Sequence, residues 1–147
     1  ILGGSPYVEP IFPTLDDMVR DWRDWEYSPE RFSSYPDKQA ILNAALNFLQ
    51  LMKEKRYQEV LRLAGGRCYE NFSKWLAEAS HSQEELERFN QYFENLEWKV
   101  GPAGMADTDP PMVRIMFALR TPDEDWDEDP CILILDYGVW KIARFID

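Results

Sequence analysis

The chain has 147 residues and a mass of 17.4 kDa, which fits one domain and is long enough to bury about two-thirds of the extended chain's surface. Hydrophobic residues make up 45% and charged residues 29%, a balance that excludes global disorder and collagen-like or disulfide-scaffold classes. The net charge of −11 opposes binding to nucleic acid or to an anionic membrane. We expect a single domain over residues 1–147, divided into an N-terminal arm and helix (1–37) and an α+β core (38–146).

The N-terminal part of the chain predicts helices. An apolar series from Leu15 to Trp25 at helical spacing, preceded by Thr14, predicts an amphipathic helix. Two prolines and three serines in residues 28–36 predict a surface connection without regular structure. Asp37 precedes an apolar helix that we expect to end near Lys55.

Three shorter helices are expected next. The segment 57–64 should stop at Gly65-Gly66, since glycine accepts the left-handed conformation that caps a helix. The apolar face of the following helix is Tyr69, Phe72, Leu76 and Ala79, and Ser82 with Glu85 forms a capping box for the last helix. Its apolar face is Leu86, Phe89, Phe93 and Leu96.

From Glu97 onward the apolar period changes from 3.6 to 2, which predicts antiparallel strands. We expect strands over residues 112–120, 131–136 and 139–146, a short one over 97–100, and a loop over 101–111. Tyr137-Gly138 is expected to form a two-residue hairpin turn. The fold class is therefore α+β, with N-terminal helices packed on one face of a curved antiparallel sheet. Because 131–136 is apolar on both sides, the other face should need a cover, such as a second copy of the chain in a homodimer.

The acidic surplus is confined to two segments. Residues 121–130 carry six acids and no base, and residues 1–37 carry eight acids and three bases. Trp126 lies at the centre of the first group, and an exposed aromatic ringed by charge is typical of a binding anchor with a steering rim. The alternatives are a solvated loop, or a calcium loop formed by the alternating aspartates, although the central Gly and terminal Glu of an EF-hand are missing.

Residues suited to catalysis are few. In the strands expected after residue 130, Asp136 is the only carboxylate. Its position beside Tyr137 favours a role in the turn. Arg114 and Arg120 share one strand face, where they could pair with acids or bind a carboxylate ligand. The single histidine, His81, falls in an interhelical link. Cys68 and Cys131 are expected to be small, mostly buried hydrophobes, with a disulfide as the alternative.

Two segments resemble the nuclear-transport-factor-2-like superfamily, the cone-shaped α+β fold shared with ketosteroid isomerase and scytalone dehydratase. They are residues 46–64, which are similar to the family's long helix, small break and short helix, and the closing strand over 138–145. The resemblance covers about residues 38–146 and departs from the usual pattern in the helix-rich stretch 67–95. It implies a pocket inside the cone, and the acidic surplus is similar to that of immunity proteins of this fold.

The sequence therefore predicts a non-catalytic, cytoplasmic protein that binds a basic protein such as a toxin and needs no cofactor or metal. The expected contact residues are Asp123, Glu124, Asp125, Trp126, Asp127, Glu128 and Asp129 together with Asp16, Asp17, Asp21 and Asp24. The alternative is a small-molecule-binding protein, or an isomerase- or dehydratase-type enzyme, that uses the cone pocket with Arg114, Arg120 or Asp136 facing inward.

Overall fold

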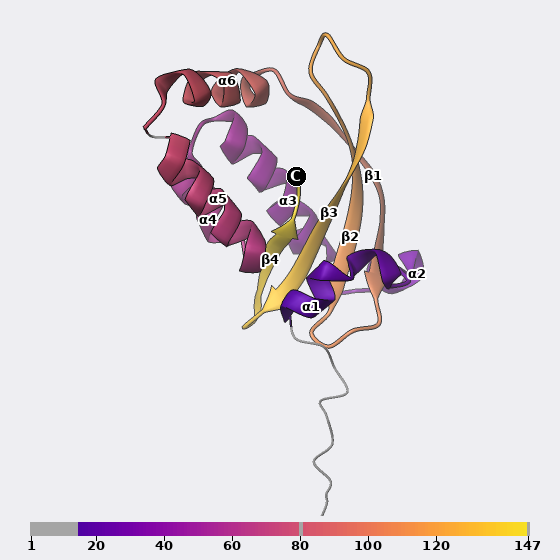
Figure 1. The fold of residues 1–147 in the computed structure, drawn as a ribbon. Coiled ribbons are helices and arrows are strands. Elements are labelled where there is room, and N and C mark those ends of the chain that lie inside the picture. The colour runs from indigo at the N-terminus through magenta and orange to yellow at the C-terminus, as the bar shows by residue number, and fades with distance from the viewer. Residues whose placement is uncertain (1–14, 80, 147) are drawn as a thin grey trace, which may run out of the picture.

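The computed structural model describes residues 15–79 and 81–146. Helices come first and strands second, as predicted (Figure 1). The helical elements are α1 (Leu15–Arg20), the 3-10 helix η1 (Trp22–Asp24), α2 (Pro29–Ser33), α3 (Lys38–Lys53), α4 (Tyr57–Leu63), α5 (Gly66–Ala79) and α6 (Gln83–Glu94). The strands are β1 (Glu97–Ala106), β2 (Met112–Arg120), β3 (Asp127–Asp136) and β4 (Val139–Arg144).

The strands form an open antiparallel sheet in the order β1-β2-β3-β4. Alternation along β2 sends Val113, Ile115 and Phe117 into the core beneath α3 and turns Arg114 and Met116 to the other side. The sheet thus has an inner face, toward α3–α6, and an outer face. The N-terminal helices pack against a sheet that is not closed into a barrel, which confirms the α+β fold class.

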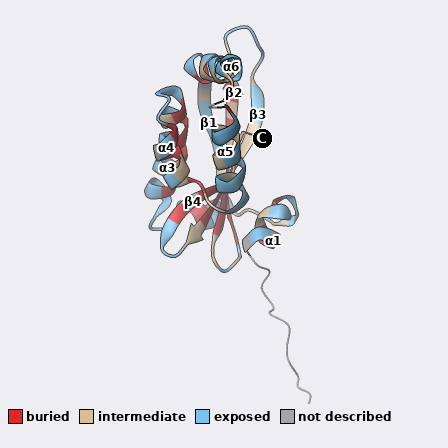
Figure 2. Cartoon of the chain, turned by 60° about the vertical axis from the view of Figure 1, so that its left-hand side comes forward, coloured by how far each residue is buried: buried red, intermediate tan, exposed pale blue. Residues whose placement is uncertain are grey.

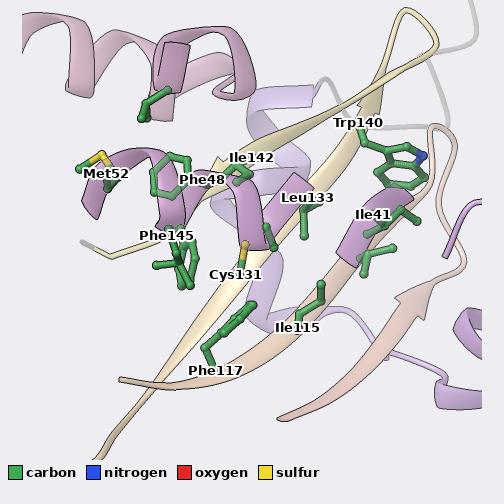
Figure 3. Close-up of a cluster of buried hydrophobic side chains, with 14 of the residues drawn as sticks. Ile41, Phe48, Met52, Ile115, Phe117, Cys131, Leu133, Trp140, Ile142 and Phe145 are labelled. Carbon is green, nitrogen blue, oxygen red and sulfur yellow. The ribbon is translucent and has the colours of Figure 1, made fainter. Parts of the chain in front are cut away.

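The inner face carries the larger core. Ile41, Phe48 and Met52 of α3 pack on Cys131, Leu133 and Phe145 from the sheet side (Figure 3). Figure 2 shows the buried residues gathered between the sheet and the facing sides of α3 and α4, whereas α5 is mostly exposed or half-buried.

Several local predictions are confirmed. The β2 strand spans Met112–Arg120 as expected, and Tyr137-Gly138 turns the β3–β4 hairpin with positive φ angles of 50° and 78°. The Ser82 side chain accepts a hydrogen bond from the Glu85 amide at 3.3 Å, so it caps α6.

Three boundaries were predicted wrongly. The connection over 28–36 contains α2, because Ser28 caps it and proline at the first helical position is compatible with a helix start; Phe32 is buried. The β1 strand runs to Ala106 and replaces much of the expected loop, with a register irregularity between Val100 and Ala103 that accommodates Gly101 and Pro102. Strand β3 begins at Asp127, so the last four residues of the expected acidic loop, 127–130, are strand.

The outer face is covered in part by the chain itself. Met18 of α1 and Trp22 of η1 pack on Met112, Ile132 and Ile134 in a second core cluster. Helices therefore pack on both faces of the sheet, not on one alone, and α1 and η1 supply the cover for this part of the outer face. The helix expected over 15–25 breaks after Arg20, and the Trp25 indole donates to the Met18 carbonyl at 3.3 Å. The predicted cap at Thr14 lies outside the described residues.

Candidate functional site

A cavity of about 470 Å³ lies on the inner side, between α3, α5, α6 and the end of β4. It exists because the apolar faces of α5 and α6 meet over the sheet without being fully buried. Phe72, Trp75 and Phe89 are half-buried, whereas Phe93 belongs to the larger core. The cavity is partly open to solvent, and its volume falls in the range of about 300–1,000 Å³ that is typical of ligand pockets.

The aromatic wall of the cavity is a contiguous cluster. The ring centroids of Trp75 and Phe89 are 3.7 Å apart, and those of Phe72 and Trp75 are 5.5 Å apart. Tyr57 of α4 packs against all three rings, and its hydroxyl donates a hydrogen bond to the side-chain oxygen of Asn90 on α6. These contacts join α4, α5 and α6 and hold the wall in place.

The polar groups of the cavity wall are few: Asn71, Tyr92 and the thiol of Cys68. Neither cysteine forms a disulfide; Cys68 is half-buried and Cys131 is buried. Burial raises the pKa of the Cys131 thiol well above its ordinary value, and the neighbouring Cys68 and Asp129 raise it further. Cys131 is therefore an unreactive core residue, as the sequence predicted.

The acidic hairpin, residues 121–130, projects at the end of β2 and β3 beyond the helices (Figure 1). Its acids do not share one face, because Asp127 and Asp129 pair with Leu119 and Phe117 on the inner side. Glu128 pairs with Ala118 on the outer side. Sequence reasoning missed this division because it treated the segment as a loop; the period of 2 applies from Asp127 onward.

Tyr92 joins the acidic hairpin to the cavity. Burial raises the pKa of its phenol, and the charges of Asp129, Glu124 and Asp127 raise the pKa further. The Tyr92 side chain lines the cavity and is 38% exposed. Tyr92 is therefore a residue of the cavity wall whose pKa responds to the charge of the acidic hairpin.

Trp126, the predicted anchor, is neither free nor part of the core. It is half-buried on the outer side, with the Lys99 Nζ atom 4.3 Å and the Arg120 guanidinium carbon 4.4 Å from its ring centre. Arg120 also donates to Glu97 Oε1 at 2.7 Å. These cation–π contacts fix the indole against β1 and β2, so most of the ring is already engaged.

The second acidic group, Asp16, Asp17, Asp21 and Asp24, lies on α1 and η1 and near them, at the end of the sheet opposite the acidic hairpin (Figure 1). Arg20 pairs with Asp17 at 2.9 Å and with Asp21 at 3.6 Å. The structure does not bring the two acidic groups together into one surface.

The residues predicted to face a cone pocket lie elsewhere. Arg114 is on the outer face with its guanidinium carbon 4.4 Å from the Tyr27 ring centre, and Arg120 is engaged with Trp126. Asp136 lines a separate cavity of about 420 Å³ beside Gly66 and Lys141. None of the three lines the aromatic cavity. His81 is exposed in the α5–α6 link.

Within residues 15–79 and 81–146, no group of three or more His, Cys, Asp or Glu side chains is arranged to hold a metal ion. The alternating aspartates that could have formed a calcium loop are therefore not arranged around a common metal site. None of the helices described is both long and apolar enough for a membrane span.

Fold and site together define an α+β protein with an open four-stranded antiparallel sheet and an aromatic cavity on its helical side. Searches against protein-family models, curated proteins and solved structures found no match to this chain.

Proposed function

We propose that the protein is a non-catalytic binding protein that holds an apolar small molecule in the aromatic cavity. The observation that carries the proposal is the cavity itself, about 470 Å³ of space walled by Phe72, Trp75 and Phe89 and left open on one side. A half-open cavity lined by rings buries an apolar ligand at low cost, because its walls are already ordered.

The wall chemistry favours binding over acid–base catalysis. Among the described residues that line the cavity, the titratable side chains are Cys68 and Tyr92. Burial and negative neighbours keep the Tyr92 phenol protonated at neutral pH. General acid–base catalysis uses a group whose pKa lies near the working pH, and Asp136, the candidate base, lines the other cavity.

A neutral fluorescent probe, N-phenyl-1-naphthylamine, tests this function. We expect saturable binding that also slows alkylation of Cys68, since the thiol lines the cavity. Cys68→Trp, which places a large side chain in the cavity, should weaken binding at least tenfold, whereas Asp136→Asn in the other cavity should leave it unchanged. Equal binding by both variants would refute the assignment.

A second candidate function is binding of a basic protein, in the manner of an immunity protein of the nuclear-transport-factor-2-like superfamily. It is supported by the acidic hairpin, which carries six acids on a projecting segment. Membership of that superfamily is itself a proposal, supported by the order of helices and strands and by a cavity between helices and sheet. With the two acidic groups at opposite ends, only the hairpin would attract such a partner.

The test of this second function uses the protein encoded by the adjoining reading frame, if that protein is basic. We expect a complex whose association rate falls at low salt when Asp123, Asp125, Asp127 and Asp129 are all changed to Asn. An unchanged rate, or no complex at all, would refute the second function and leave the first standing.

A further inference from the structure

The cavity of about 420 Å³ is built from parts of the chain that are far apart in sequence. It is enclosed by α1, by the link from α4 to α5 and by the β3–β4 hairpin, which lie at the same end of the sheet (Figure 1). The link is fixed to the sheet because the Gly65 amide donates to the Ile142 carbonyl at 2.9 Å. A Cβ atom at Gly65 would lie 2.9 Å from the Lys141 Cβ, so glycine allows this close approach.

Charged side chains of both signs meet in this cavity. Among the described residues, those that line it come from four elements: Asp16 of α1, Arg67 of α5, Asp136 of β3 and Lys141 of β4. Within residues 15–79 and 81–146, none of these four forms an ion pair. The Lys141 ammonium donates to the Arg62 carbonyl at 2.5 Å, which uses one of its three donors. Two positive and two negative groups are therefore available to a ligand.

The same cavity has apolar surface. Val19, Ile134 and Ala143 line it, and the last two belong to the core cluster on the outer face. Such a surface favours an apolar group of a ligand, because the contact removes that group from water. The volume also falls in the range of about 300–1,000 Å³ that is typical of ligand pockets.

The mixture of charges selects among ligands. A ligand that carries only a negative charge would be attracted by Arg67 and Lys141 but repelled by Asp16 and Asp136, and a purely positive ligand would meet the reverse. A ligand with a carboxylate and an ammonium forms charge-assisted hydrogen bonds with both pairs. An arginine fork suits a carboxylate, which it binds through two parallel hydrogen bonds.

From this arrangement we infer that the cavity binds a small zwitterion with an apolar side chain, such as an aliphatic amino acid. The carboxylate pairs with Arg67 and Lys141, the ammonium pairs with Asp16 and Asp136, and the side chain lies on the apolar surface. This site is separate from the aromatic cavity, and the function proposed for that cavity does not depend on it.

The test compares three probes that share one branched alkyl chain. They are L-leucine, 4-methylpentanoate, which lacks the amino group, and 3-methylbutylamine, which lacks the carboxylate. Affinity is measured by calorimetry, and the NMR amide signals of Gly65, Gly66 and Ala143 locate the bound probe. At low salt we expect L-leucine to bind at least tenfold more tightly than either single-charge probe, because it alone pairs with groups of both signs. This preference should shrink as salt is raised.

Two double variants that keep the net charge of the protein separate this site from the rest of the surface. Asp16→Asn with Arg67→Gln removes one group of each sign from the cavity, and both residues are exposed, so the fold should be retained. We expect L-leucine to bind at least tenfold more weakly to this variant. The matched control, Asp24→Asn with Arg62→Gln, changes exposed residues outside the cavity and should bind L-leucine as the original protein does.

The outcomes distinguish the two cavities. If L-leucine does not bind, binds no more tightly than the single-charge probes, or binds equally to both double variants, the zwitterion site is refuted. Signal changes confined to residues around Trp75 would place L-leucine in the aromatic cavity and would also refute it. Binding of the naphthylamine probe should not change when L-leucine is added, so the function proposed for the aromatic cavity is tested separately.

Discussion

Replacing Gly104 by alanine should destabilise the protein without altering the cavity. Gly104 is buried in β1 where the chain between η1 and α2 crosses the sheet edge. A Cβ atom there would lie 2.8 Å from the Tyr27 Cβ and 2.9 Å from the Tyr27 carbonyl carbon and oxygen. Two of these three atoms are backbone, so a side-chain rotation cannot relieve the contact.

The loss of stability can be estimated from the contacts that the displaced Tyr27 backbone would disturb. Tyr27 precedes Ser28, which exchanges two backbone hydrogen bonds with Met105 at 2.9 and 3.0 Å. Losing both would cost about 1 kcal/mol each, and keeping them would impose overpacking strain of about 1–3 kcal/mol. We therefore expect Gly104→Ala to lower the free energy of unfolding by about 2–3 kcal/mol.

Urea unfolding followed by tryptophan fluorescence measures this change, with Gly138→Ala as the control. Gly138 has a positive φ of 78° but nothing within 4 Å of an added Cβ, so it should lose only about 1–2 kcal/mol from backbone strain. The folded Gly104→Ala protein should bind the neutral naphthylamine probe with unchanged affinity, because the contact lies away from α5 and α6. A Gly104→Ala protein as stable as the original, or one with the cavity lost, would refute the reasoning.

Three further outcomes are expected. Trp126→Ala should lower stability by about 1–2 kcal/mol through the loss of two cation–π contacts, and Trp126→Phe by less; equal melting temperatures for all three proteins would contradict this. Burial raises the pKa of Tyr27 to about 12, against the opposing charge of Arg114, so the unfolded chain loses this proton first and stability should fall as pH rises from about 10 to 12. This fall in stability should be smaller in Tyr27→Phe. Parallel pH profiles for the two proteins would contradict the role assigned to Tyr27. Native protein treated with N-ethylmaleimide should be modified at Cys68 and not at Cys131, as measured by peptide mass analysis. Equal labelling of the two cysteines would show that the Cys131 thiol is not shielded from the reagent.

The parts of the fold that sequence predicts well are those set by local chemistry. Alternation in residues 112–120 defines β2, the capping box defines the start of α6, and Tyr137-Gly138 defines a turn. The segment 28–36 was misinterpreted because proline was taken only as a breaker, although Ser28-Pro29 is also a helix start.

The candidate site depended on information that the sequence pattern does not hold. The apolar faces of α5 and α6 were recognised, but whether they close on each other or leave a cavity is decided by how far apart the helices lie. The separation of the two acidic groups follows from which end of the sheet α1 packs against. The partners of Trp126 come from β1 and β2, and only the sheet register places Lys99 and Arg120 beside it.

The cation–π contacts of Lys99 and Arg120 with Trp126 reduce the conformational entropy of the acidic hairpin. A hairpin that extends past its supporting helices would ordinarily sample many shapes. Here one indole is held by cations from two strands, immediately before Asp127. Carboxylates mounted on so restrained a segment lose little freedom when something binds, which makes the hairpin a preorganised element.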